Sequence, residues 1–194
     1  MYSLLIDTHD TKVSFVLYKD GLIKDSIIQE SNLRHSEIAM PSLNEIISRN
    51  NLNIRDINEI LVVIGPGSFT GVRIGVVIAK TIAYLLDISI KCITSLDLVV
   101  FSNDKVIPGS YFIEEKNGYF IGKYDQSGKL DGDIKYISKS EFIKENYVSS
   151  LEINYENIYK NSKNIEPTNP HLVNPLYVKQ IEVLKWFYHY QLIK

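Results

Sequence analysis

The sequence contains a single cysteine, Cys92, among its 194 residues, so no disulfide can form within the chain. Cys92 lies in an apolar run and is expected to be a buried structural thiol, as free cysteines usually are. Neither sign of charge predominates: the chain has 21 basic and 23 acidic residues, and no run of lysine or arginine occurs. That balance does not suggest the basic patch of a freestanding nucleic-acid-binding protein.

Spaced metal ligands and familiar catalytic motifs are absent as well. The four histidines include no pair at helical spacing, and none flanks a carboxylate in a metal-binding motif. Ser68 is not in a nucleophile elbow, because Pro66 and Thr70 stand where that motif needs glycine. The sequence therefore predicts no metal site and gives no support to nucleophilic catalysis. A peptidase is also unsupported, because it would need a nucleophile or a set of metal ligands.

Long hydrophobic runs are missing too. The N-terminus has no basic region and reaches Asp7 too early for a signal peptide. The most apolar window, Val72–Ile90, is interrupted by Arg73, Lys80 and Asp87, so no membrane span is expected. These features predict a cytoplasmic protein with no membrane partner.

Apolar periodicity up to residue 101 predicts the order β-β-β-α-β-α-β. Three strands form a meander that ends at Glu30, a helix capped by Ser36 follows, and a second helix covers Gly71–Leu86. A short helix capped by Ser95 closes this part. The sequence thus predicts an α/β fold, a mixed sheet with flanking helices, divided into residues 1–101 and 102–194.

The second part has short strands and frequent turns. A hairpin is expected around Asn117-Gly118, and Asp131-Gly132-Asp133 is interpreted as another hairpin turn. A helix of one to two turns is expected over Glu141–Asn146, and the polar stretch Asn154–Pro170 predicts a loop or linker. The aromatic segment Val178–Ile193 predicts a terminal helix.

The most informative stretch is a glycine-rich turn between a strand and a helix. The apolar run Ile60–Ile64 stops at Gly65-Pro66-Gly67, and Ser68 is placed to cap the helix that follows. Such a turn aims backbone N–H groups at one point and suits an anion or a close partner backbone. A sharp turn without any ligand explains the glycines equally well. The spacing matches neither the Walker loop nor the dinucleotide fingerprint.

Asp7 and Thr8 follow the first strand as the phosphate and metal residues of actin-like ATPases do. The competing interpretation, which the sequence favours, is that Asp7 bonds the backbone of its own turn. An ATPase of this class also needs a second phosphate loop, and Asp131-Gly132-Asp133 is only a weak candidate for one. A small ATPase or kinase using Asp7, Thr8 and the glycine loop is therefore the alternative function.

Small residues recur every four positions along the second predicted helix, at Gly71, Gly75, Ala79 and Ala83. They form a ridge that allows another element to approach closely. A glycine inside a helix costs about 0.5–1 kcal/mol relative to alanine, so Gly75 should be offset by packing. The ridge can face the chain's own sheet or a helix of another chain, and the pattern does not decide between them.

A set of short motifs, in this order and at matching separations, resembles the TsaB (YeaZ) family of glycoprotease-like proteins. The motifs are Ile6-Asp-Thr8, His35-Ser-Glu37, Gly65-Pro-Gly-Ser-Phe-Thr-Gly-Val-Arg-Ile-Gly75, Ala79-Lys80 and Thr94-Ser-Leu96. The similarity is strong over about residues 3–98, and Asn174–Val178 is similar to the family's ending. The second part of the chain, residues 102–194, departs from the family pattern at Ile113-Glu-Glu-Lys116, where the family has an Asp-Ala-Arg-like start to a strand.

The resemblance implies an actin-like, RNase H-like fold in two lobes, the second reduced. It implies a non-catalytic subunit that pairs with the catalytic paralogue TsaD, with TsaE joining, to install threonylcarbamoyl on adenosine 37 of tRNAs that read ANN codons. tRNA would be met only through the complex. No cofactor would be held firmly by this chain alone, with Asp7, Thr8, Gly65, Gly67 and Ser68 as weak candidates, and ATP or ADP would bind, if at all, at the interface.

The resemblance also places the partner interface on the first two helices. An exposed apolar patch is expected there, serving TsaD when present and a second copy of the chain when it is absent. The patch is expected around Met40, Leu43, Ile47, Val72 and Val76, and the whole interface is expected to comprise Met40, Leu43, Ile47, Gly71, Val72, Gly75, Val76 and Ala79.

Overall fold

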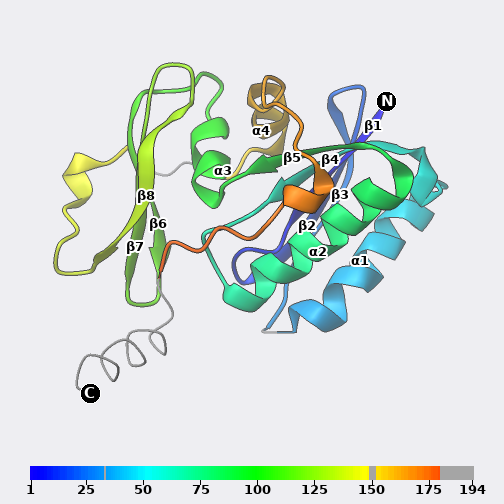
Figure 1. Cartoon of the computed structure of the whole chain (residues 1–194), viewed down its shortest axis with the longest axis horizontal. Helices are drawn as coiled ribbons and strands as arrows, with labels where there is room; N and C mark the ends of the chain where they lie inside the picture. The colour runs from blue at the N-terminus through cyan, green and yellow to red at the C-terminus, as the bar shows by residue number, and fades with distance from the viewer. Residues whose placement is uncertain (33, 149–151, 180–194) are drawn as a thin grey trace.

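A computed structural model describes the whole chain except residues 33, 149–151 and 180–194. Two β-sheets dominate it, with helices on both faces of the larger sheet (Figure 1). The terminal helix expected over Val178–Ile193 lies almost wholly outside the described residues.

The larger sheet has five strands in the order β3-β2-β1-β4-β5. Strands β1 (Tyr2–Asp7), β2 (Lys12–Lys19) and β3 (Leu22–Glu30) form the expected antiparallel meander. Strands β4 (Ile57–Val63) and β5 (Ser89–Ile93) continue from β1 in parallel. The mixed sheet predicted from the apolar pattern is therefore confirmed.

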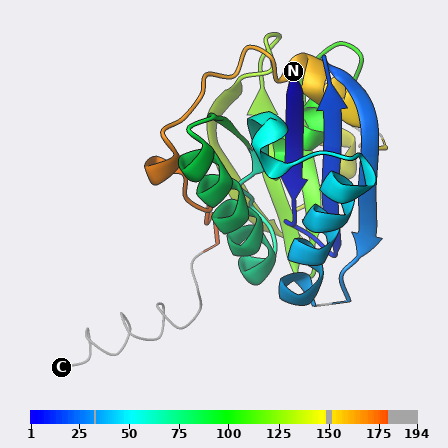
Figure 2. The same cartoon turned by 90° about the vertical axis from the view of Figure 1, so that its right-hand side faces the viewer.

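Helices α1 (His35–Arg49) and α2 (Phe69–Leu86) pack side by side on one face of this sheet (Figure 2). Successive side chains of a strand point to opposite faces of the sheet, so alternate residues of each strand pack on opposite sides. Leu4 and Ile6 of β1 join the core under α1 and α2, whereas Leu5 points to the other side. A short 3-10 turn, Ile54–Asp56, connects α1 to β4.

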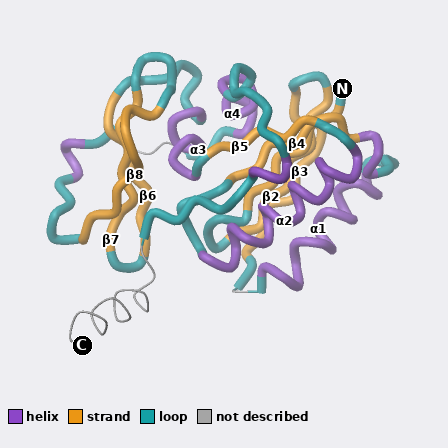
Figure 3. The backbone as a smooth tube through the Cα atoms, viewed as in Figure 1, coloured by secondary structure: helices purple, strands orange, loops and turns teal. Residues whose placement is uncertain are grey.

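The other face carries α3 (Ser95–Phe101), which links the two sheets. The smaller sheet is an antiparallel ladder of β6 (Gly109–Glu115), β7 (Gly118–Tyr124) and β8 (Leu130–Ser138). Its inner face packs on α3, and both belong to the core cluster that also covers Leu5. Figure 3 shows the smaller sheet standing beside α3, away from α1 and α2.

Strand β8 was not predicted, and Asp131-Gly132-Asp133 is not a hairpin turn. These residues lie inside β8, where the register against β7 shifts between Ile121 and Lys123. Gly132 has φ of +86°, a conformation that glycine adopts without strain. A bulge in the middle of a strand thus explains a turn-like sequence.

The stretch expected to be a loop, Asn154–Pro170, contains helix α4 (Tyr155–Asn161), so that prediction is wrong. The Asn154 side chain caps α4, and Ile158 and Tyr159 are buried. The Tyr159 ring stacks on Tyr18 of β2 with centroids 4.4 Å apart. Side-chain bonds from Asn157 and Asn161 to backbone carbonyls of Phe101, Ser102 and Asn103 hold the polar side of α4.

Three expected helix starts also differ. The cap of α3 is Thr94, which forms a capping box with Asp97, rather than Ser95. Helix α1 begins at His35 without a side-chain cap, so Ser36 lies inside it. The helix expected over Glu141–Asn146 is only a 3-10 turn, Lys144–Asn146, because Glu141 instead bonds the backbone and hydroxyl of Ser138.

After α4 the chain returns to α2, and we call residues 168–178 the return segment. Thr168 N–H donates to the Ile90 carbonyl of β5 over 2.8 Å, and a 3-10 turn follows at Pro170–Leu172. Val173 enters the core beneath α2, and the segment lies beside that helix in both ribbon views (Figures 1 and 2). The division at residues 101 and 102 stays a prediction, with these later residues packed on the first sheet.

Candidate functional site

The glycine-rich turn before α2 is pressed against the turn between β1 and β2. Ser68 N–H donates to the His9 carbonyl over 2.6 Å. A Cβ added to Gly67 would collide with the same carbonyl, and one on Gly71 would collide with the Thr8 carbonyl. Backbone contact, rather than turn geometry alone, therefore requires glycine at these two positions.

The Thr8 side chain joins this turn to the first turns of α2. Its hydroxyl donates to the Gly71 carbonyl over 2.7 Å and accepts from the Gly75 N–H over 3.1 Å. A Cβ on Gly75 would overlap the Thr8 hydroxyl. The small-residue ridge thus faces the chain's own sheet, which answers the question that the pattern left open.

The rest of the turn is held by α3 and the return segment. Ser95 N–H donates to the Gly65 carbonyl over 2.9 Å, and its hydroxyl donates to the Pro66 carbonyl. Leu176 N–H donates to the Ile64 carbonyl over 2.7 Å. Three distant parts of the chain meet at this turn, so its backbone serves as a junction within the fold.

Asp7 bonds its own turn, as the favoured interpretation expected. Asp7 Oδ1 accepts from His9 N–H over 3.0 Å and lies 2.7 Å from His9 Nδ1. Burial alone would lower the pKa of His9, but the charge and hydrogen bond of Asp7, with Asp10 beyond, raise it overall. Burial, with a smaller contribution from the Asp7 charge, raises the pKa of Tyr155 to about 12. Asp7 is thus part of a buried polar cluster.

His35 belongs to the same neighbourhood, and residue chemistry alone did not single it out. Its Nε2 lies 2.7 Å from the Asp10 carbonyl, and the side chain is buried at the start of α1. Because a carbonyl oxygen only accepts, Nε2 carries the proton. The His35-Ser-Glu37 motif was the available signal. In the structure, His35 of this motif links the start of α1 to the β1–β2 turn by its hydrogen bond to Asp10.

Of the five weak cofactor candidates, the structure brings all to this junction, with Thr8 and Ser68 hydroxyls already hydrogen-bonded inside the chain. The described residues contain no group of three or more histidine, cysteine or carboxylate side chains placed to hold a metal ion. The interpretation of Asp7, Thr8, Gly65, Gly67 and Ser68 as a nucleotide site stays a prediction, and their hydrogen bonds favour a structural role.

The expected exposed patch on α1 and α2 is wrong as a surface. Four of its five residues, Leu43, Ile47, Val72 and Val76, are buried inside the chain, and only Met40 is exposed, at 47%. Helix α2 carries apolar residues on its exposed side as well as on its buried side, so its pattern could not tell one from the other. The other residues expected at the partner interface, Gly71, Gly75 and Ala79, are buried too.

A different apolar surface of α2 faces solvent, and we call it the outer α2 face. Val77 and Leu85 are 58% and 71% exposed there. The outer α2 face consists of the exposed residues Thr70, Val77, Thr81 and Leu85, none of them charged. Ile74 and Ile78 flank it and are partly buried against the core under α1 and α2, and the exposed Arg73 lies beside it.

By length and composition alone, α2 is also the one helix among the described residues that could cross a membrane. Its ridge packs on β1, which makes it the core helix of the larger sheet. The outer α2 face is therefore a second apolar side of a helix already anchored by its first.

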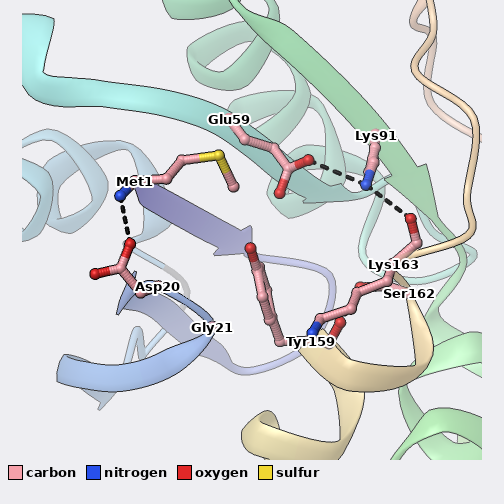
Figure 4. A pocket seen from close by; sticks show the side chains of 8 residues that line it. All are labelled: Met1, Asp20, Gly21, Glu59, Lys91, Tyr159, Ser162 and Lys163. Carbon is pink, nitrogen blue, oxygen red and sulfur yellow. Dashed lines mark hydrogen bonds and ion pairs between the residues drawn. The ribbon is translucent and has the colours of Figure 1, made fainter.

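A cleft of about 390 Å³ lies elsewhere, between the β2–β3 turn, the edge of the sheet and α4 (Figure 4). Lys91 Nζ lies 3.0 Å from Glu59 and donates to the Lys163 carbonyl over 3.1 Å. The Met1 ammonium lies 2.6 Å from Asp20. These charges satisfy one another, so the cleft presents no catalytic arrangement.

Comparison with solved structures establishes the fold. YeaZ from Pseudomonas aeruginosa superposes with a TM-score of 0.71 over 91% of this chain and 100% of that chain, at 16% identity. The expected actin-like α/β fold, with a mixed sheet and flanking helices, is confirmed.

Sequence comparison gives the family. Residues 28–110 match the model of TsaD, tRNA N6-adenosine threonylcarbamoyltransferase. The Bacillus subtilis tRNA threonylcarbamoyladenosine biosynthesis protein TsaB is 37% identical over 97 residues, which cover 50% of this chain and 42% of that protein. An uncharacterized protein of Mycoplasma genitalium is 30% identical over 92% of this chain and 95% of its own length. The chain belongs to the TsaB (YeaZ) family.

The relatives differ in how much of this chain they match. The matched Bacillus stretch is 97 residues long, half of this chain, whereas the match to the Mycoplasma protein runs almost from end to end. The matches to TsaB proteins span less than two thirds of those proteins, from 36% of the Escherichia coli protein to 58% of a Buchnera aphidicola protein.

Proposed function

We propose that this TsaB-family chain is a non-catalytic partner subunit in the installation of threonylcarbamoyl on adenosine 37 of ANN-decoding tRNAs. Its catalytic partner would be a TsaD-like protein, and TsaE would join the complex with ATP. The names of the relatives support the pathway, and the outer α2 face is the observation that carries the partner role.

The outer α2 face supports docking because a helix apolar on both sides needs cover on both sides. The ridge is covered by β1, whereas Val77 and Leu85 stay exposed. Contiguous apolar patches of more than a few hundred Å² are seldom left open on soluble monomers. Exposed Met40 of α1 lies on the neighbouring helix, so we include it in the docking surface.

The non-catalytic role is supported by the glycine junction. Two backbone N–H groups that could face a phosphate already donate within the chain, that of Ser68 to the His9 carbonyl and that of Gly71 to the Ser68 hydroxyl. Asp7, which an actin-like ATPase would need, is paired with His9. ATP or ADP would then be held at the interface of the complex, and tRNA would be met through the partner.

Without its partner, the chain would pair with a second copy through the same docking surface. A two-fold dimer is the commonest closed assembly of identical chains. The two pairings would exclude each other because they cover one surface. We place the protein in the cytoplasm, where tRNA modification takes place.

The test is reconstitution with the TsaD-like and TsaE-like proteins of the same organism. We expect the purified chain alone to hydrolyse no ATP and to transfer nothing to tRNA, and the full set to form threonylcarbamoyladenosine only when the chain is present. Robust ATP turnover by the chain alone, lost on Asp7→Ala, would establish the alternative ATPase instead. Failure to co-purify with the TsaD-like protein would reject the partner role.

A further inference from the structure

Three exposed side chains form a cluster where α2 begins. The Arg73 guanidinium carbon lies 3.7 Å from the centre of the Phe69 ring and 5.6 Å from that of Tyr177. Arg73 Nε donates to Tyr177 Oη over 2.6 Å, and the two ring centres are 5.3 Å apart. The Phe69 and Tyr177 side chains remain 42% and 48% exposed. An arginine is thus stacked on two rings at the surface.

The cluster is held in place from both sides. Phe69 and Arg73 are four residues apart on α2, so they project from the same side of the helix. Tyr177 comes from the return segment, which the Leu176–Ile64 backbone bond ties to the glycine junction. An arginine fixed in this way loses little conformational entropy when it binds, so the cluster is preorganised.

Most of the guanidinium's hydrogen-bonding capacity is left over. In the part of the chain that the structure describes, Tyr177 is its only hydrogen-bond partner, and no carboxylate pairs with it. The two terminal nitrogens of an arginine form a fork that matches a carboxylate or a phosphate. Arginine and aromatic residues are also the types that dominate binding energy at protein interfaces.

The surroundings favour a protein carboxylate over a nucleic-acid phosphate. Val77, one turn beyond Arg73, belongs to the apolar outer α2 face. The next cation along this side, Lys80, donates to the Val173 carbonyl over 2.9 Å. Nucleic-acid sites neutralise several phosphates, which a single arginine beside an apolar surface does not do. One cation among apolar residues fits a helix that carries one carboxylate among apolar residues.

We propose that the Phe69–Arg73–Tyr177 cluster anchors the partner subunit by binding a carboxylate on the helix that covers the outer α2 face. The inference rests on the proposed function and deepens it, because it makes the return segment part of the docking surface. The arginine supplies charge and orientation, and the two rings fix its plane.

The experiment measures the affinity of the full chain for the TsaD-like protein by calorimetry. We expect Arg73→Gln to weaken binding about tenfold or more, as loss of an interface anchor does. Arg73→Lys keeps the charge but loses the fork, so it should recover only part of the affinity. Tyr177→Phe should weaken binding less than Arg73→Gln, since the ring remains. Arg55→Gln, at an exposed arginine in the turn before β4, is the matched control and should bind normally.

A charge exchange identifies the source of the anion. Arg73→Glu should abolish binding, and a single Asp→Lys or Glu→Lys change on the partner should restore it. Normal affinity of Arg73→Gln, with an unchanged melting temperature, would overturn the inference and leave the proposed function standing. Loss of tRNA binding by the assembled complex with pairing unchanged would assign Arg73 to phosphate and overturn it too. A wild-type chain that does not pair would reject both proposals.

Discussion

Helix α2 has two apolar sides that are built from different residues. The inner side carries glycine and alanine and lies against Thr8, directly after β1, whereas the outer side carries larger groups such as Val77 and Leu85. Hydrophobicity does not distinguish the two sides, but side-chain size does. The small side approaches the sheet closely enough for backbone contact, and the large side is left for another surface to cover.

The strongest test of this contrast is Gly75→Leu on the inner side. The new side chain would overlap the Thr8 hydroxyl and displace a buried hydrogen bond. Overpacking and a lost bond together should lower the free energy of unfolding by at least about 3 kcal/mol. Urea unfolding followed by circular dichroism measures this, with Val77→Leu on the outer side as the control. Equal stability of the two variants would mean that the sides are not distinct.

Removing the hydroxyl that joins β1 to α2 should have the next largest effect. Thr8→Val keeps the shape but removes both buried hydrogen bonds that the hydroxyl forms with Gly71 and Gly75 of α2. The cost should be about 1–3 kcal/mol of unfolding free energy. Thr70→Val, at an exposed position of the same helix, should change stability by less than about 0.5 kcal/mol. The comparison loses its basis if the two valine variants unfold at the same urea concentration.

Val77→Asp reverses the pattern, because it should spare the fold and weaken binding. A charge on the outer α2 face would stay solvated in the free chain and be buried in the complex. We expect the affinity for the TsaD-like protein to fall at least about tenfold, which is about 1.4 kcal/mol. Light scattering should show the self-association of the free chain falling in parallel. An outer face that tolerates aspartate in both assays is not a docking surface.

The smallest effect concerns His9 beneath the junction. Its pKa is raised above the ordinary value of 6.5, so the protonated form is favoured in the folded chain. The resulting stabilisation is complete below about pH 6.5 and is lost as the pH rises through the folded-state pKa. The wild-type chain should therefore lose stability relative to His9→Asn as the pH rises above about 6.5. His171→Asn, at an exposed histidine, should follow the wild-type curve, and an identical curve for His9→Asn would contradict the expectation.

The larger sheet could be predicted because its signals are local. Alternating apolar residues set β2, Asp20-Gly21 set the hairpin, and Ser68 set the start of α2, where its side chain accepts from the Gly71 N–H. Each signal depends on neighbours within a few residues. Local patterns of this kind survive because no distant contact has to override them.

The parts that failed depend on distant contacts. Strand β8 is defined by pairing with β7, and its bulge at Gly132 imitates a turn. Helix α4 is defined by Tyr159 stacking on Tyr18, a contact between residues 141 positions apart in the sequence. The prediction of the exposed patch on α1 and α2 failed for a related reason. Which side of α2 faces the sheet depends on the contact with Thr8, which lies far away in the sequence.

The return segment sets the order in which the molecule can be completed. Arg73 and Tyr177 are separated by 104 positions, so α2 leaves the ribosome long before the segment that flanks it. At synthesis rates of about 5–20 residues per second, that delay is roughly 5–20 s. During this interval the nascent α2 lacks the return segment beside it and the Tyr177 ring that contacts Phe69 and Arg73. Chaperones that shield apolar segments have that window in which to act on the nascent helix.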